Sequence, residues 1–139
     1  QAVLAGEKMR WIIGKKTVDR DWRIAIQDPR DSKTYLTKLR VPDMAVVTSG
    51  DYERYFDAQR EYHHIINPQT GRSATELISV TVIAKTAFAA DALSTAAFVL
   101  GPDRGFDLIQ SLDGVEALFI TRSRSVRKTD GFSRYEIRT

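Results

Sequence analysis

Hydrophobic and polar residues divide the centre of the chain into a strand followed by a helix. Residues 78–84 are rich in β-branched side chains, which is typical of a buried strand. Residues 87–100 contain neither Gly nor Pro, are rich in alanine, and end at Gly101-Pro102, a helix stop signal. The pattern therefore predicts a strand that leads directly into a long helix over residues 87–100.

Few polar side chains fall on this predicted helix, namely Asp91, Ser94 and Thr95. A helix that is apolar nearly all round is expected to be buried, and a buried carboxylate needs a partner charge or a metal ion. Thr95 lies one turn after Asp91 on the same face, and two hard oxygen donors at this spacing suit Mg²⁺ or Ca²⁺. The ordinary alternative stays open, in which Asp91 binds backbone amides or an arginine and Thr95 bonds back to a carbonyl.

Short β-prone runs separated by turn residues precede this centre. Residues 14–21, which lie between the first two runs, contain a glycine and several charges and predict a hairpin loop. The order of strand, turn and strand favours an antiparallel meander. The predicted strands are residues 9–13, 22–26, 35–41 and 45–48.

The remainder of the chain predicts a shorter helix and two more strands. Residues 106–112 place Phe106, Ile109 and Leu112 on one face of an amphipathic helix. The strands are expected over residues 115–121 and 135–138, and the basic segment 122–131 between them is expected to form an exposed hairpin tip, with an anion-binding arm as the alternative.

These elements define the expected fold class, which is α+β. A mainly antiparallel sheet packs on one long buried helix, with a shorter helix beside it. The 139 residues are expected to form a single segment, because the chain is too short for two ordinary domains.

Composition excludes several functions. No cysteine is present, so disulfides, cysteine-bound zinc and a cysteine nucleophile are excluded. The net charge of +3 is mild and does not point to nucleic acid. Charged residues and prolines interrupt every apolar stretch, so no membrane span is expected, and the first residues lack the pattern of a targeting signal.

Two adjacent histidines precede a tight turn. Residues 67–71, Asn-Pro-Gln-Thr-Gly, are turn formers, because Pro fixes φ, Asn folds its side chain onto the backbone and Gly adopts positive φ. In an extended segment, His63 and His64 point to opposite faces, so at most one of them is expected to face a site. The alternative for each is a structural or solvent-facing imidazole.

Three motifs occur in order along the chain. Residues 49–56 read SGDYERYF, residues 63–71 read HHIINPQTG, and residues 90–95 read ADALST. Their order, spacing and wording resemble the C-terminal half of the FAD:protein FMN transferase family, the ApbE-like flavin transferases. This resemblance extends over nearly the whole chain and implies half of a larger ApbE-like fold.

The resemblance implies a flavin-dependent transferase activity. Family members bind FAD with Mg²⁺, cleave its pyrophosphate, and transfer FMN to a Ser or Thr hydroxyl of a target protein. Others hydrolyse FAD to FMN and AMP. The implied metal ligands are Asp91 and Thr95, and His64 is the implied catalytic residue.

The same resemblance implies a set of flavin-binding residues. They are Ser49 and Gly50, which match a loop that lines the pocket, together with His64 and Ile65. His63 falls one place early and is not assigned a role.

Family members are longer than this chain, which leaves three interpretations. The chain is a fragment, one half of a split protein, or a reduced homologue, and the expected partners include the N-terminal half of the fold or a partner chain. By resemblance, the expected location is the bacterial cell envelope. Residues 6–8, Gly-Glu-Lys, differ from the usual Gly-Gly-Asp or Gly-Gly-Asn of the family. This difference motivates the alternative of a non-catalytic flavin-binding module.

Overall fold

The structure is a computed structural model that describes residues 2–5, 9–12 and 21–137. Short strands are the most numerous elements of the described chain, and one long helix lies in its second half. In chain order, the elements are β1 (Ala2–Ala5), β2 (Met9–Ile12), β3 (Arg23–Gln27), β4 (Tyr35–Arg40), β5 (Ala45–Gly50), β6 (Ile66–Asn67), β7 (Arg72–Ser73), β8 (Leu77–Ala84), α1 (Ala87–Gln110), β9 (Glu116–Thr121), β10 (Val126–Lys128) and the 3-10 helix η1 (Phe132–Arg134).

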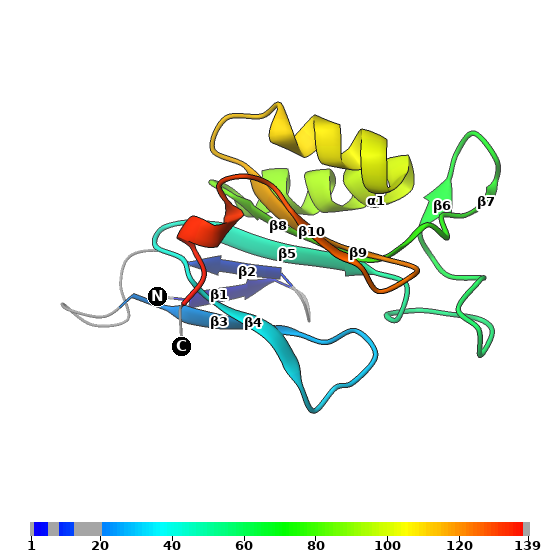
Figure 1. The fold of residues 1–139 in the computed structure, drawn as a ribbon, viewed down its shortest axis with the longest axis horizontal. Coiled ribbons are helices and arrows are strands. Elements are labelled where there is room, and N and C mark those ends of the chain that lie inside the picture. The colour runs from blue at the N-terminus through cyan, green and yellow to red at the C-terminus, as the bar shows by residue number, and fades with distance from the viewer. Residues whose placement is uncertain (1, 6–8, 13–20, 138–139) are drawn as a thin grey trace.

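The elements form three layers. The middle layer is a six-stranded sheet with the order β1-β2-β5-β8-β9-β10, and its neighbouring strands are antiparallel. Helix α1 covers one face of this sheet, and the antiparallel hairpin β3–β4 lies against the other (Figure 1). The predicted α+β class, with antiparallel sheets packed on a helix, is confirmed.

Strand β8 is the centre of the sheet, as the sequence predicts. All eight of its residues are buried, because it has a strand on each side and a layer on each face. Val80 and Val82 belong to the core cluster beneath α1. Ile78 and Ile83 belong to the second cluster, beneath the β3–β4 hairpin. A strand covered on both faces reads as a continuous apolar run, which explains why its position was visible in the sequence.

The helical region differs from the prediction of two helices. The structure has one helix, α1, with a break at Gly101, whose φ of 83° lies outside the helical range. The part after the break contains Pro102 in its first turn, where proline is tolerated because that N–H has no intrahelical acceptor. The predicted shorter helix over residues 106–112 is therefore wrong in its bounds, since the helical segment begins earlier and ends at Gln110.

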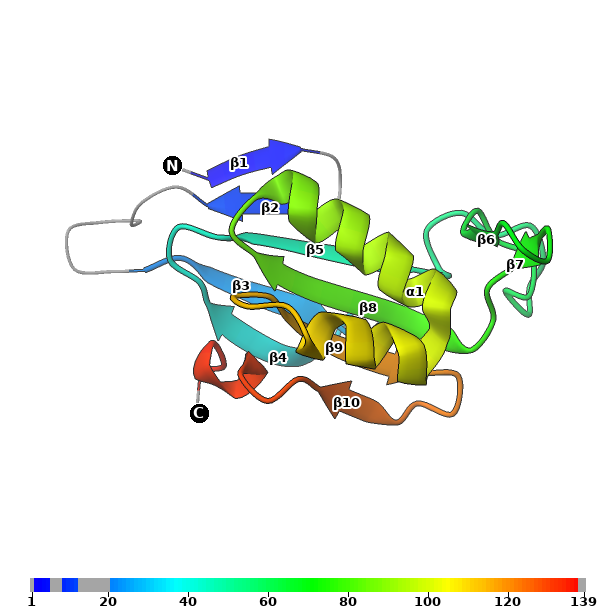
Figure 2. The same cartoon turned by 90° about the horizontal axis from the view of Figure 1, so that it is seen from above.

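The expectation that the long helix is buried nearly all round is also wrong. One face packs on the sheet through Ala90, Ser94, Ala97 and Phe98, and the helix lies across the sheet as a surface layer (Figure 2). The opposite face of the helix is exposed, and it comprises Phe88, Asp91, Ala92, Thr95 and Ala96.

Within the described part of the chain, no helix combines the length and apolar character needed to cross a membrane.

The hairpin predicted between residues 9–13 and 22–26 is wrong in its strand pairing. β2 pairs with β1 and β5 in the large sheet, whereas β3 pairs with β4 in a separate two-stranded sheet. Residues 13–20, which connect β2 to β3, lie outside the described residues. Hydrophobic alternation locates the strands but does not select their partners, because either pairing buries the same apolar face.

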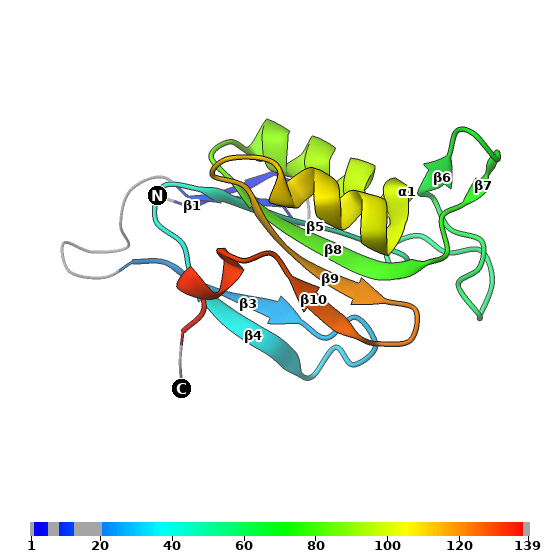
Figure 3. The ribbon, with the colours of Figure 1, turned by 45° about the horizontal axis from the view of Figure 1, so that its top comes forward.

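The predicted terminal strand over residues 135–138 is also wrong. The 3-10 helix η1 occupies the preceding residues, and the chain then runs beside β4 through a single bridge between Leu39 and Glu136 (Figure 3). The Tyr135 carbonyl accepts from the Arg40 N–H of β4 at 2.7 Å, but the Tyr135 N–H donates to the Phe132 carbonyl at 3.0 Å and so does not pair with β4. Residues 138–139 lie outside the described residues.

The basic side chains of segment 122–131 form ion pairs with acidic residues elsewhere in the fold. All four of its basic side chains have an acidic partner, which disfavours the alternative of an anion-binding arm. The ion pairs are Arg122 with Asp51, Arg124 with Asp28, Arg127 with Asp103 and Lys128 with Glu136.

Candidate functional site

A cluster of hydroxyl groups joins the end of β5 to helix α1. The Ser49 Oγ lies 2.8 Å from the Ser94 Oγ and 3.2 Å from the Thr95 Oγ1. Ser94 donates to the Asp91 carbonyl at 3.0 Å, so the Ser49 hydroxyl donates to Ser94. The structure thus brings together Ser49, Thr95 and the turn that begins at Asp91, three positions predicted to share a site.

Ser49 and Gly50 lie in a strand and not in the loop that the sequence predicted. They pair with Val80 and Ser79 of β8, as the last two residues of β5. Gly50 is buried, and a Cβ atom at this position would overlap the ring of Tyr52. The strand therefore delivers the Ser49 hydroxyl rigidly to the helix, and the small size of Gly50 lets the Tyr52 ring fold back against the strand end.

Asp91 is exposed, so the expectation of a buried carboxylate is wrong. Asp91 lies on the outer face of α1 together with Ala92 and Ala96. These two alanines contribute to the apolar pattern of the sequence, but they are exposed in the structure. Among the described residues, no hydrogen bond or ion pair engages the Asp91 carboxylate, and neither an arginine nor a backbone amide neutralises it.

The donor set at this place fits a hard divalent cation that keeps several waters. Asp91 supplies a free carboxylate and Thr95 a hydroxyl one turn later, and both are oxygen ligands. The described part of the chain contains no group of three or more His, Asp or Glu side chains able to hold a metal. Mg²⁺ is commonly held by one or two carboxylates together with waters and substrate phosphates, so the residues present match that type of site.

His63 has a structural environment. Its ring is fully buried and lies edge-on to Phe98, with ring centroids 5.7 Å apart. The Nε2 lies 2.8 Å from the Ala74 carbonyl oxygen, and the Ile65 N–H donates to Nδ1 at 3.3 Å. These partners assign a neutral ring with its proton on Nε2. Burial lowers the pKa of His63 below its ordinary value of 6.5.

His64 points the other way and is exposed. Its backbone N–H donates to the Arg54 carbonyl at 3.1 Å, and its Nδ1 lies 3.3 Å from the same oxygen. Because the preceding His63 packs on Phe98, three residues after Thr95, the segment that carries His64 is docked on the same helix as the hydroxyl cluster. The imidazole of His64 is therefore exposed on a segment that is fixed to α1.

Ile65 is buried in the core cluster beneath α1, with 5% of its surface exposed. Its carbonyl oxygen accepts a hydrogen bond from Ala74 N–H at 3.0 Å. The predicted flavin contact of Ile65 stays a prediction, and a buried side chain limits it to the backbone. Residues 6–8, which depart from the usual family sequence, lie outside the described residues.

Sequence reasoning missed a buried ion cluster beside the site. Asp51 has no exposed surface, and both of its carboxylate oxygens accept hydrogen bonds from Arg30, at 2.7 and 2.6 Å. These bonds raise the pKa of Arg30 above its ordinary value, and burial raises the pKa of Tyr52 to about 12, with the charge of Asp51 as a further cause. The sequence does show a charged residue, Asp51, between a predicted strand and a turn. Its partners Arg30 and Arg122 lie too far away in the sequence for the ion cluster to be recognised.

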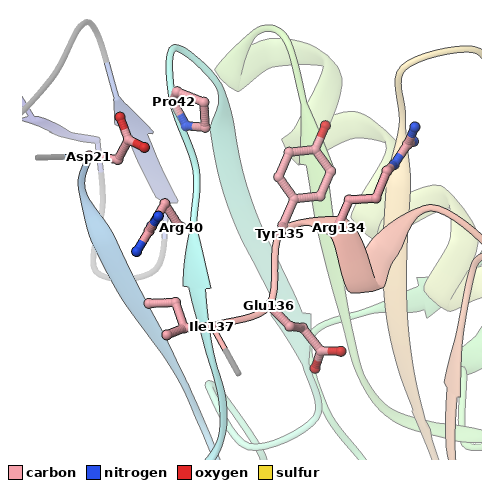
Figure 4. Close-up of a pocket in the computed structure, with 7 residues that line it drawn as sticks. All are labelled: Asp21, Arg40, Pro42, Arg134, Tyr135, Glu136 and Ile137. Carbon is pink, nitrogen blue, oxygen red and sulfur yellow. The ribbon is translucent and has the colours of Figure 1, made fainter. Parts of the chain in front are cut away.

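Two surface hollows lie away from the predicted site residues. One, of about 400 Å³, is bounded by Tyr62, Arg72 and Arg122 among others. The other, of about 420 Å³, lies between the β3–β4 hairpin and the C-terminal segment (Figure 4). Neither is lined by Ser49, His64, Asp91 or Thr95. The second hollow is lined by Asp21, Arg40, Pro42, Arg134, Tyr135, Glu136 and Ile137.

The fold and the hydroxyl cluster define an α+β chain with a polar site where a central strand meets a surface helix. The model of the ApbE family matches residues 2–119, and the chain belongs to this family.

Relatives with a known name support this assignment. The chain is 44% identical over 115 residues to the FAD:protein FMN transferase of Treponema pallidum, a match that covers 80% of this chain and 32% of that protein. It is 37% identical over 111 residues to the FAD:protein FMN transferase of Escherichia coli strain K12, which covers 78% of this chain and 31% of that protein. The chain thus spans about a third of the length of these curated relatives.

Solved structures of the family have the same fold over this length. The ApbE protein of Thermotoga maritima superposes with a TM-score of 0.85 at 35% identity, over 94% of this chain and 43% of that chain. The flavinyl transferase ApbE of Pseudomonas stutzeri, in its apo form, superposes with a TM-score of 0.74 at 35% identity, over 93% of this chain and 41% of that chain. This chain therefore corresponds to part of a larger ApbE structure.

Proposed function

We propose that this chain forms the C-terminal half of an ApbE-like flavin transferase domain and contributes its metal and flavin site. The proposed reaction is Mg²⁺-dependent cleavage of the FAD pyrophosphate and transfer of FMN to a Ser or Thr hydroxyl of a target protein. Support comes from the family membership and from relatives that carry the name FAD:protein FMN transferase.

The observation that carries this proposal is the free carboxylate of Asp91, one helical turn before the Thr95 hydroxyl that contacts Ser49. Ser94 is fully buried and bonded to Ser49 across 2.8 Å, so the turn from Asp91 to Thr95 is anchored to the sheet. The backbone of this turn is therefore fixed, while the exposed Asp91 carboxylate has no partner among the described residues. An unneutralised oxygen donor on an anchored backbone suits a ligand that arrives with a cation.

Cleavage of a pyrophosphate requires charge neutralisation on the phosphoryl oxygens, and a bound Mg²⁺ supplies it as a Lewis acid. Asp91 and Thr95 are the residues of this chain that would hold the ion. The Ser49 hydroxyl fixes the direction of the Thr95 hydroxyl through their 3.2 Å contact.

His64 is the proposed catalytic residue because its imidazole is exposed and its backbone is fixed. A histidine near the reacting phosphate is able to take the proton of the incoming hydroxyl or to donate to a phosphate oxygen. His63 does not compete for this role, since both of its ring nitrogens already have backbone partners.

The proposal is tested by comparing Asp91→Asn with Asp107→Asn. Both acids are exposed on α1, but Asp107 lies after the break at Gly101 and away from the hydroxyl cluster. Isothermal titration with Mg²⁺ and FAD should show affinity reduced by about tenfold or more in Asp91→Asn, with no change in Asp107→Asn. Equal affinities for the two variants would refute the metal assignment.

Mass spectrometry separates the possible activities. The chain is incubated with FAD, Mg²⁺ and a candidate target protein, with and without the N-terminal half of a homologous transferase. A mass increase of one FMN on the target supports the transferase. Release of AMP without that increase identifies an FAD pyrophosphatase, and quenched flavin fluorescence without turnover identifies a non-catalytic binding module.

A further inference from the structure

The carboxylate of Asp51 is a fully buried charge held by two arginines. Arg30 contributes a bidentate contact through Nη1 and Nη2, at 2.7 and 2.6 Å, and Arg122 adds a contact from Nη1 at 3.3 Å. A buried carboxylate is costly unless such partners are present. The cluster therefore persists only while all three segments that supply it stay in place.

The two arginines come from different turns at one end of the molecule. Arg30 lies in the turn between β3 and β4, and Arg122 is the first residue after β9. Asp51 follows β5 directly, and its N–H donates to the Ile78 carbonyl at 3.0 Å. One carboxylate thus ties the hairpin layer, the central sheet and the β9–β10 turn together.

Arg122 extends this connection to the loop between β5 and β6. Its Nη2 donates to the Gln59 carbonyl at 2.8 Å, and its Nη1 lies 3.5 Å from the Arg60 carbonyl. Arg60 in turn places its guanidinium 5.0 Å from the Tyr55 ring centroid and donates to the Pro29 carbonyl at 3.4 Å. The tip of the loop is therefore held by the same two turns that hold Asp51.

His63 and Ile65 at the end of the loop are buried, but its tip has little apolar packing. Phe56 and Tyr62 are 77% and 64% exposed. The loop folds back on itself through hydrogen bonds from Phe56 N–H to the Tyr62 carbonyl at 2.8 Å and from His64 N–H to the Arg54 carbonyl at 3.1 Å. A segment with exposed aromatic rings and few buried contacts opens easily unless polar contacts hold it.

We propose that Asp51 is a positioning residue that, through Arg122, holds the tip of this loop, residues 53–62, and thereby the Arg54 carbonyl that contacts His64. Asp51 itself touches no ligand. The inference rests on the proposed function only for the role of His64, because the holding of the loop stands on the contacts alone.

A second buried acid of this chain provides a matched control. Glu116 is also paired with an arginine, since Arg134 donates to its Oε1 at 2.9 Å, and the Gly131 N–H and the Thr129 hydroxyl donate to Oε2. It ties β9 to the C-terminal segment, and among the described residues none of its hydrogen-bond partners lies in the loop between β5 and β6. Loss of either acid should lower stability, but only the Asp51 cluster should affect that loop.

Hydrogen exchange measured by NMR tests the holding of the loop. Asp51→Asn and Arg122→Ala should each speed exchange of the Phe56 and His64 amides by about tenfold or more relative to the β8 amides, and Glu116→Gln should not. If Asp51→Asn does not fold, Arg122→Ala alone tests the inference, because this variant leaves the ion pair of Arg30 with Asp51 intact. Equal exchange at these two amides in Arg122→Ala and Glu116→Gln overturns the inference.

Flavin binding tests the role of the held loop. If the wild-type chain binds FAD, Arg122→Ala should weaken its affinity by about tenfold, Arg122→Lys should restore it in part, and Glu116→Gln should leave it unchanged. Faster loop exchange with unchanged FAD affinity overturns the link to His64. If the wild-type chain binds no FAD even with the N-terminal half of a homologous transferase present, the proposed function is refuted instead, and the exchange result alone tests the holding of the loop.

Discussion

Two adjacent histidines have opposite environments in this protein. His63 is enclosed between Phe98 and the Ala74 carbonyl, whereas His64 is open to solvent beside Arg54. Alternation along an extended segment accounts for the difference, because successive side chains point to opposite faces. The consequence is that the buried ring of His63 fixes the segment, while the ring of His64 stays exposed to solvent.

The pKa of His63 predicts how stability depends on pH. Burial lowers the pKa of His63 in the folded state below 6.5. Just below pH 6.5 the unfolded chain is therefore protonated at His63, whereas the folded chain is not. Stability is therefore full above pH 6.5 and falls as the pH drops below that value towards the folded pKa. Urea unfolding at a series of pH values should show a shallower decline in His63→Gln than in the wild type.

His64→Gln is the control for this experiment. Because the His64 ring is exposed, its replacement should leave the decline in stability below pH 6.5 unchanged. A His64→Gln protein that loses the decline, together with a His63→Gln protein that keeps it, would contradict the assignment of His63 as the buried neutral ring.

At the scale of elements, the two parts of helix α1, before and after the break at Gly101, pack against each other. After the break at Gly101, the chain returns so closely that a Cβ atom at Gly105 would overlap the carbonyl group of Ala97. The small size of Gly105 therefore sets how tightly the second part packs on the first. Ile109, on the same segment, is fully buried beneath it.

Replacement of Gly105 by alanine should destabilise the protein. The new methyl group meets backbone atoms, which move less readily than a side chain, so the expected loss is about 1–3 kcal/mol. Arg104→Ala, an exposed change in the same turn, should stay within about 0.5 kcal/mol of the wild type. Thermal and urea unfolding measure both, and a Gly105→Ala protein as stable as Arg104→Ala would show that the two parts are not in contact.

The elements differ in how far the sequence predicted them. The strand over residues 78–84 and the helix start at residue 87 were correct because β-branched runs and alanine runs are local signals. The exposure of Asp91 was not predictable in the same way, since alanine is found both inside and on the surface of proteins. An apolar helix pattern built largely of alanine therefore does not distinguish a buried helix from one that covers a sheet.

The whole molecule depends on contacts that no local pattern reveals. Asp51 and Arg122 are 71 residues apart, and Arg30 approaches from the other side of the sheet. Only the fold brings them together, so the sequence motif that contains Asp51 predicted a site without its supporting ion cluster. The proposed metal residues were easier to find, because Asp91 and Thr95 lie one helical turn apart.

The three-layer arrangement predicts that the β3–β4 hairpin contributes to global stability. Leu39 of β4 is fully buried against the sheet, whereas Leu36 of the same strand is 38% exposed. Leu39→Ala should therefore cost about 2–5 kcal/mol of unfolding free energy, because it removes buried methyl groups and leaves a cavity. Leu36→Ala removes the same atoms largely from solvent and should cost much less. Urea unfolding followed by circular dichroism measures both, and equal losses would mean that the hairpin does not pack as a third layer.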